Sequence, residues 1–191
     1  MEIECIYCDM TDEASIKSAI QPLLKAKRQI DVLVNNAGVA TGGFLQMTSM
    51  QQIRDVFQIN FFSHVYITQM ISKLMMRQKS GVIINMGSVA GLENFAGYTA
   101  YGSSKAAIML FTKTIARELA PYGIRVNAIA PGLTDTGMAG QMEEKAWHEM
   151  VGRTDMNRLG KPEEIANAIV WLASDAASFL TGQIIRVDGG M

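Results

Sequence analysis

The sequence lacks an excess of either charge and has no long apolar run. Its 191 residues include 17 Lys and Arg against 18 Asp and Glu, which gives a formal net charge of −1. A nucleic-acid or anionic-membrane partner would need a basic surface, so this balance disfavours both. No apolar run reaches the ~18 residues of a membrane span, and no charged-then-apolar leader follows Met1. We therefore expect a soluble, cytoplasmic protein.

Cysteine is also scarce, since Cys5 and Cys8 are the only two. Their C-x-x-C spacing fits either a metal or redox site or ordinary core packing. The run from Ile3 to Cys8 is typical of a strand, in which residues three apart point to opposite faces. No second Cys or His pair completes a zinc site, because His64 and His148 are isolated. We therefore expect both cysteines in the core and no bound metal.

Hydrophobic residues are abundant, at 49% of the chain, and can supply the core of one domain. Short β-branched runs alternate with longer amphipathic stretches, which predicts a parallel α/β architecture. The expected strands span residues 3–8, 31–35, 82–86, 124–130 and 184–187. The expected helices span residues 12 or 13–28, 49–79 with an interruption near Asn60, 99–120 and 162–173.

A hydroxyl, a phenol and an ammonium group are predicted to meet where the strand 82–86 is followed by the helix 99–120. Ser88 follows the strand end, while Tyr101 and Lys105 lie four residues apart near the helix start and share one face. A nearby ammonium stabilises a phenolate and lowers a phenol pKa that starts near ~10. The three groups would suit proton transfer to a carbonyl oxygen. The alternative is that Tyr101 packs sideways and Lys105 is solvated.

This stretch resembles the active site of the short-chain dehydrogenase/reductase family, most closely the 3-oxoacyl-acyl-carrier-protein reductases of fatty acid biosynthesis. Further family motifs occur in the same order. The run Asn35-Asn36-Ala37-Gly38 matches N-N-A-G, and Pro131-Gly132-Leu133-Thr134-Asp135-Thr136 matches P-G-x-x-x-T. The resemblance implies a Rossmann-like, doubly wound parallel sheet, with residues 1–191 forming a single partial domain.

The resemblance also implies an NAD(P)(H)-dependent oxidoreductase that interconverts a ketone and a secondary alcohol. In such an enzyme Ser88 would hydrogen-bond the substrate carbonyl and Tyr101 would deliver the proton. Lys105 would lower the Tyr101 pKa and hold the cofactor ribose. Asn60 matches a catalytic Asn whose backbone carbonyl holds a relay water. On the residues alone, Asn60 is equally an Asn that interrupts a helix.

The implied dinucleotide site draws on the ends of several strands, and NADPH is favoured over NAD. Its residues are Asp9, Asn35, Ala37, Gly38, Tyr101, Lys105, Pro131, Gly132, Thr134 and Thr136. Asp9 would lie near the adenine ring. On the residues alone, Asp9 is equally a turn residue or a helix cap. The implied substrate is carried by an acyl carrier protein, with a small ketone, sugar or steroid alcohol as the alternative. A homodimer or homotetramer would form through the helices 49–79 and 99–120.

The sequence lacks the glycine-rich T-G-x-x-x-G-x-G turn that the family places after its first strand, where backbone N–H groups receive the pyrophosphate. By this comparison an N-terminal β-α-β-α portion of about 50 to 60 residues is absent. We expect residues 3–8 either to pair directly with residues 31–35 or to lie across an open slot that a further segment fills. The alternative to a reductase is a cofactor-free fragment that only associates.

Overall fold

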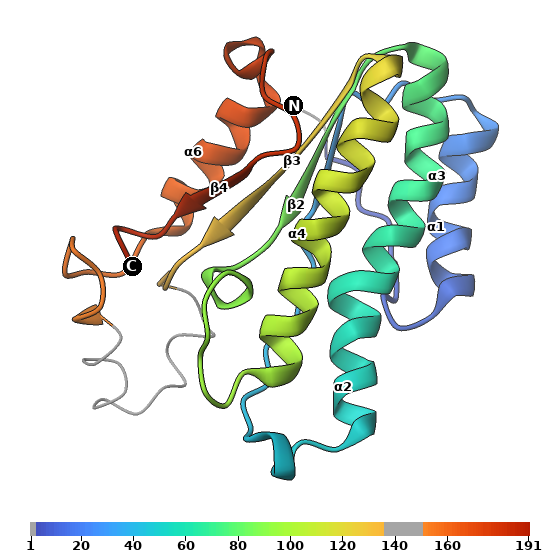
Figure 1. Cartoon of the computed structure of the whole chain (residues 1–191). Coiled ribbons are helices and arrows are strands. Elements are labelled where there is room, and N and C mark those ends of the chain that lie inside the picture. The colour runs from blue at the N-terminus through green and yellow to red at the C-terminus, as the bar shows by residue number, and fades with distance from the viewer. Residues whose placement is uncertain (1–2, 136–150) are drawn as a thin grey trace.

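The computed structural model describes residues 3–135 and 151–191, which form a parallel sheet covered by helices on both faces (Figure 1). The strands lie in the order β1 (Val32–Asn35), β2 (Gly81–Met86), β3 (Ile124–Pro131) and β4 (Ile184–Val187). All three neighbouring pairs are parallel. Helices α3 (Ser63–Gln78) and α4 (Thr99–Leu119) cover one face, and α6 (Pro162–Ala173) covers the other. The four later expected strands and the expected helices are therefore confirmed, with ends shifted by a few residues.

The core lies on both faces of the two central strands, as the near-continuous apolar runs of a buried parallel sheet require. On one face Ile83 and Val126 pack against side chains of α3 and α4. On the other face Ile84 and Ile129 pack against α6, including Leu172. Both layers fix the carboxyl ends of β2 and β3 relative to the helix that follows β2.

Helix ends are set by short polar side chains. The N-cap of α1 (Glu13–Lys25) is Asp12, whose carboxylate accepts from two backbone N–H groups. At α2 (Met50–Phe57), Ser49 and Gln52 form a reciprocal capping box. The expected interruption near Asn60 is confirmed, because a π-helical turn at Gln58–Phe62 joins α2 to α3. No helix in the described part of the chain is long and apolar enough to cross a membrane.

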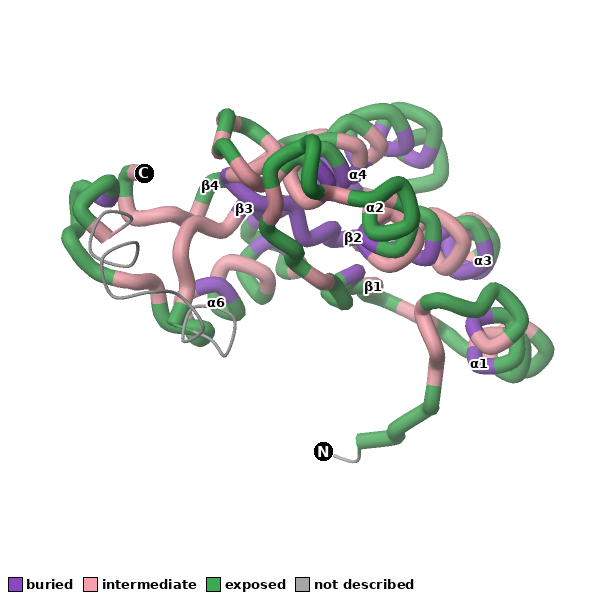
Figure 2. Tube along the Cα trace, turned by 90° about the horizontal axis from the view of Figure 1, so that it is seen from below, coloured by how far each residue is buried: buried purple, intermediate pink, exposed green. Residues whose placement is uncertain are grey.

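The expected strand at residues 3–8 is wrong. These residues form no ladder with β1, and Figure 2 shows them leading away from the sheet to the exposed N-terminal end. Ile3 and Tyr7 are 76% and 85% exposed. A strand needs a neighbour for its backbone groups, and the described residues place none on the free side of β1. The expected core packing of the cysteines fails for the same reason, since Cys5 is exposed and Cys8 half-buried.

Candidate active site

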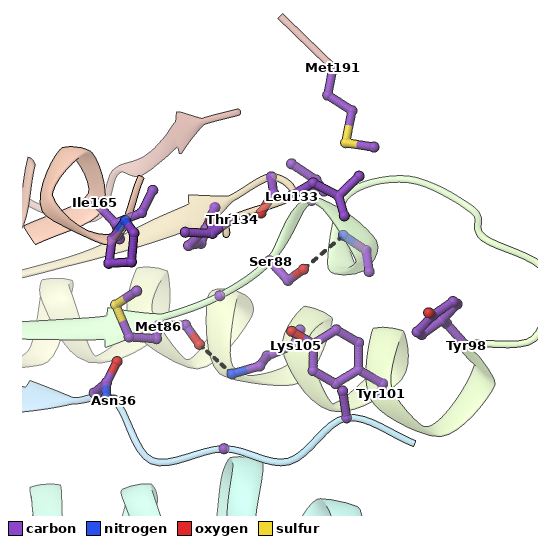
Figure 3. Close-up of a pocket in the computed structure, with 18 of the residues that line it drawn as sticks. Asn36, Met86, Ser88, Tyr98, Tyr101, Lys105, Leu133, Thr134, Ile165 and Met191 are labelled. Atoms are coloured by element: carbon purple, nitrogen blue, oxygen red, sulfur yellow. Dashed lines mark hydrogen bonds between the residues drawn. The ribbon is translucent and has the colours of Figure 1, made fainter. Parts of the chain in front are cut away.

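A pocket of about 590 Å³ opens at the carboxyl ends of β1, β2 and β3 (Figure 3). Its walls come from the segment after β1, the turn after β2, the start of α4, the segment after β3 and one side of α6. In open parallel sheets this edge is where ligands bind, because several strand ends and helix starts meet there.

Ser88, Tyr101 and Lys105 come together on one wall of this pocket, as the sequence predicted. The Ser88 hydroxyl accepts from the Ala90 N–H at 3.1 Å, which holds it at the strand end. Its side chain also lies close enough to the Tyr101 phenol to lower the pKa of that group. One turn later on α4, Lys105 Nζ donates to the Met86 carbonyl at 2.9 Å and lies 5.8 Å from the centre of the Tyr101 ring.

The electrostatics of the tyrosine differ from the prediction. Burial is the main cause that raises the pKa of Tyr101 above its ordinary value, and the hydrogen bond from Ser88 lowers it only in part. Lys105 was predicted to lower that pKa, but in the free protein the lowering comes from Ser88. Burial also lowers the pKa of Lys105 to about 8. At neutral pH, therefore, Tyr101 is a phenol with a proton to give and most Lys105 side chains are charged.

Two glycines bring the Ser88 turn and the Tyr101 helix together. A Cβ on Gly102 would lie 2.5 Å from the Ala90 carbonyl oxygen, and one on Gly91 would lie 2.6 Å from the Ala106 nitrogen. Both distances are shorter than atoms tolerate, so only glycine permits this contact between backbones. The sequence analysis missed these roles, although both glycines stand beside the predicted catalytic residues.

Asn60 is buried and uses its side chain to join two elements. Its Nδ2 donates to the Val39 carbonyl at 2.9 Å and to Ser104 Oγ at 3.0 Å, and its Oδ1 accepts from the Val39 N–H at 2.9 Å. The segment after β1 is thus held against α4 close to Lys105. The role predicted for the Asn60 backbone carbonyl stays a prediction.

The predicted cofactor residues fall into two groups. Six predicted residues line the pocket, namely Gly38, Tyr101, Lys105, Pro131, Gly132 and Thr134. Asn36 and Tyr98 also line it, although they were not predicted. Asp9 does not line the pocket, and its carboxylate closes a turn by accepting from the Thr11 N–H at 2.8 Å. Asn35 and Ala37 do not line it either. Thr136 lies outside the described residues.

A family model described as enoyl-(acyl carrier protein) reductase matches residues 1–191, the whole of this chain. The chain belongs to the short-chain dehydrogenase/reductase family. It is 40% identical over 190 residues to 3-oxoacyl-[acyl-carrier-protein] reductase of Thermotoga maritima, covering 100% of this chain and 77% of that enzyme. It is 35% identical over 186 residues to the enzyme of the same name from Escherichia coli K12, covering 97% and 76%.

Solved structures agree with this membership of the short-chain dehydrogenase/reductase family. A xylitol dehydrogenase bound to NAD⁺ has a TM-score of 0.87 at 32% identity, covering 96% of this chain and 77% of that one. ElxO bound to NADP has a TM-score of 0.87 at 32% identity, covering 95% and 75%. These likenesses confirm the predicted Rossmann-like parallel sheet, and they include proteins bound to either nicotinamide cofactor.

This family member also has a buried polar row that the sequence analysis missed. Asn35 Nδ2 donates to Asn85 Oδ1 at 2.7 Å and to Thr68 Oγ1 at 2.9 Å, and Asn85 Nδ2 donates to Thr112 Oγ1 at 2.8 Å. The row joins β1 and β2 to α3 and α4. The sequence indicates this row by an Asn near the end of each of two successive apolar strands, Asn35 in β1 and Asn85 in β2.

Ion pairs hold the loop that forms the outer wall of the pocket. Arg186 on β4 pairs with Glu93 at 2.7 Å and with Asp188 at 2.6 Å. The guanidinium of Arg153 lies 4.7 Å from the centre of the Phe95 ring in the same loop. The loop between Ser88 and Tyr101 is therefore tied to the C-terminal strand.

Proposed function

We propose that this chain is the carbonyl-reducing part of an NAD(P)(H)-dependent reductase that converts a ketone into a secondary alcohol, with NADPH as the preferred cofactor. The observation that carries the proposal is the meeting of Ser88, Tyr101 and Lys105 on one wall of an apolar pocket. Membership of an oxidoreductase family supports it. The choice of NADPH rests on the 3-oxoacyl-carrier-protein reductases among its relatives.

The pocket fits the nicotinamide and ribose end of such a cofactor. Lys105 uses one of its N–H donors on the Met86 carbonyl, which leaves donors for a ribose hydroxyl. Gly38 places backbone beside the lysine, since a Cβ there would lie in ordinary contact with Lys105 Nζ at 3.4 Å. The sequence contains no glycine-rich turn to receive the pyrophosphate. The bound cofactor would supply the hydride.

The chain's own residues supply proton transfer and orientation. The Ser88 hydroxyl would donate a hydrogen bond to the substrate carbonyl oxygen, polarising it. The Tyr101 phenol, protonated at neutral pH because burial raises its pKa, would donate its proton as the oxygen gains negative charge. The ammonium of Lys105, held beside the ring, would stabilise the phenolate that remains.

The pocket lining favours an acyl chain over a sugar. Its walls include Val89, Phe95, Leu133, Ile165, Ile169 and Met191. Side chains of this kind gain free energy by covering CH₂ groups and offer few partners for the hydroxyls of a polyol. A 3-oxoacyl thioester on an acyl carrier protein is therefore the first choice, and a small apolar ketone is the second.

The test is NADPH oxidation by the 191-residue chain with a 3-oxobutanoyl thioester, followed by absorbance, together with direct NADPH and NADH titrations. We expect saturable NADPH binding and turnover, each stronger with NADPH than with NADH. Binding without turnover would overturn the assigned chemistry. If neither cofactor binds at millimolar concentration, the chain acts as a module that associates without cofactor.

We further propose that two copies pair through α4 and the α2–α3 stretch. Phe62 and Leu110 are 52% and 66% exposed on these helices. Aromatic rings link the two elements, with Phe61 and Phe111 centred 6.0 Å apart. Other apolar residues of the same helices lie in the core and are not available for pairing, namely Met70, Leu74 and Met109. The proposed occupant is a second copy, in which case the same patch of each copy would face the other across a two-fold axis.

A further inference from the structure

His64, near the start of α3, is the one described residue whose buried side-chain nitrogens make no hydrogen bond of good geometry with the protein. The side chain is 0% exposed. A buried polar atom without a hydrogen bond costs about 1 to 3 kcal/mol, so proteins satisfy such atoms with protein groups or with ordered water. On sequence alone His64 is an isolated residue, and the mechanism above does not use it.

His64 lies near Lys105, on the side of the segment that follows β1. It follows Asn60 by four residues in the same helical stretch, and its ring faces the Ala37 backbone, whose weak hydrogen-bonding contact raises the His64 pKa and can satisfy at most one of the two ring nitrogens. At the next residue, a Cβ on Gly38 would lie 3.4 Å from both Lys105 Nζ and Asn60 Oδ1. His64, Asn60 and Lys105 therefore surround the same short piece of backbone after β1.

The charge states of the two basic groups are set by burial and by each other. Burial first, and the charge of Lys105 second, lower the pKa of His64 to about 4, while the Ala37 backbone opposes the shift. Lys105 is the one charged group among the described residues that acts on the ring. With its own pKa lowered to about 8, Lys105 is mostly charged at pH 7 while His64 is neutral. A neutral imidazole offers one donor and one acceptor, which suits a water molecule.

We propose that His64 is a positioning residue that holds an internal water against the ammonium group of Lys105. The water accepts a hydrogen bond from Lys105 Nζ and donates one to the unprotonated ring nitrogen of His64. This hydration offsets part of the burial of Lys105 and keeps the side chain charged at the pH where Tyr101 gives up its proton. The effect on turnover rests on the proposed function, whereas the water and the Lys105 charge do not.

The test is the pKa of Lys105, measured by NMR on the full chain with ¹³C-labelled lysine, in wild type, His64→Leu and His64→Asn. We expect His64→Leu to lower that pKa by about one unit, because a buried ammonium loses its water. His64→Asn should restore it, because an amide binds water without titrating. The exposed Lys113 on the same helix serves as the control within each sample.

An unchanged Lys105 pKa in His64→Leu would overturn the proposal, and so would a His64→Asn variant that behaves like His64→Leu. Should His64→Leu fail to fold, a high-resolution crystal structure of the wild-type chain decides instead. A water within about 2.7 to 3.2 Å of both a His64 nitrogen and Lys105 Nζ supports the proposal, and a dry ring overturns it. In an active chain, His64→Leu should also shift the alkaline fall of kcat/KM to lower pH. Of these tests, only the pH dependence of kcat/KM requires the proposed function to be correct.

Discussion

At the scale of single residues, two phenols share the pocket wall but differ in what they contact. The rings of Tyr98 and Tyr101 meet edge to face with centres 6.2 Å apart. Ser88 lies close enough to the Tyr101 phenol to lower its pKa, and Lys105 lies over the same ring. The proposed proton donor is therefore distinguished from Tyr98 by its partners and not by its burial in the pocket.

Replacing Tyr101 by Phe should lower kcat/KM by about 100-fold or more, since a positioned general acid contributes about that much. Tyr98→Phe removes the same atom from the neighbouring ring and should leave most of the activity. Both variants should unfold at the wild-type temperature, which a thermal melt checks. Comparable loss of turnover in the two variants would show that Tyr101 has no special role.

Lys105 is 4% exposed, and burial holds its pKa near 8 instead of its ordinary 10.5. The unfolded chain therefore binds more protons than the folded one between these values, so the wild-type free energy of unfolding rises with pH there. Lys105→Met should abolish turnover but stabilise the protein at pH 7 by about 1 to 3 kcal/mol. The gain should shrink towards pH 10. Denaturant unfolding at several pH values checks this, with Lys113→Met as the control for loss of an exposed lysine from the same helix.

At the scale of elements, the contact between the Ser88 turn and α4 sets the relative positions of the proposed catalytic residues Ser88 and Tyr101. Gly102→Ala would place a Cβ 2.5 Å from the Ala90 carbonyl oxygen and push the turn from the helix. We expect a destabilisation of about 1 to 3 kcal/mol and a fall in kcat that exceeds any rise in KM. Gly42→Ala is the matched control, because its Cβ would meet only the Gly97 carbonyl oxygen at 3.8 Å. A Gly102→Ala variant with wild-type kcat would contradict this role.

Helices and strands that are specified by their own residues could be predicted from the sequence. Pro162 opens α6 and a β-branched run forms β4, and the observed bounds equal the expected 162–173 and 184–187. The run at residues 3–8 has an equally clear strand pattern, yet it is not a strand. Strand formation depends on a neighbour supplied by distant parts of the chain, and no pattern within six residues reports that neighbour.

The same division applies within the site. The spacing of Tyr101 and Lys105 on one helix is local, and the strand end places Ser88 beside them, so their convergence was predictable. The contacts of Asn60 with Val39 and Ser104 join segments up to 44 residues apart. The effect of burial on the Tyr101 pKa depends on the whole pocket. Neither can be deduced from the residues alone.

At the scale of the whole molecule, the proposed pairing through α4 makes a sharp prediction. Leu110→Glu would place a charge on the exposed apolar part of α4 and should convert a dimer or tetramer into smaller species at micromolar concentration. Val170→Glu is the control, since Val170 is equally exposed, at 66%, but lies on α6 across the sheet. Sedimentation velocity should show smaller species for Leu110→Glu and the wild-type assembly for Val170→Glu. A wild-type monomer at that concentration would exclude the interface.

The free side of β1 has a consequence for amide hydrogen exchange. The Val82 N–H bonds to the Asp31 carbonyl, which fixes the phase of the parallel ladder between β1 and β2. In such a ladder alternate residues of a strand bond to a given neighbour. The amides of Leu33 and Asn35 therefore turn towards β2, and those of Val32 and Val34 turn away from it. Exchange rates should alternate along these four residues, slow and fast in turn. Uniform slow exchange would reveal that another strand covers this edge in solution.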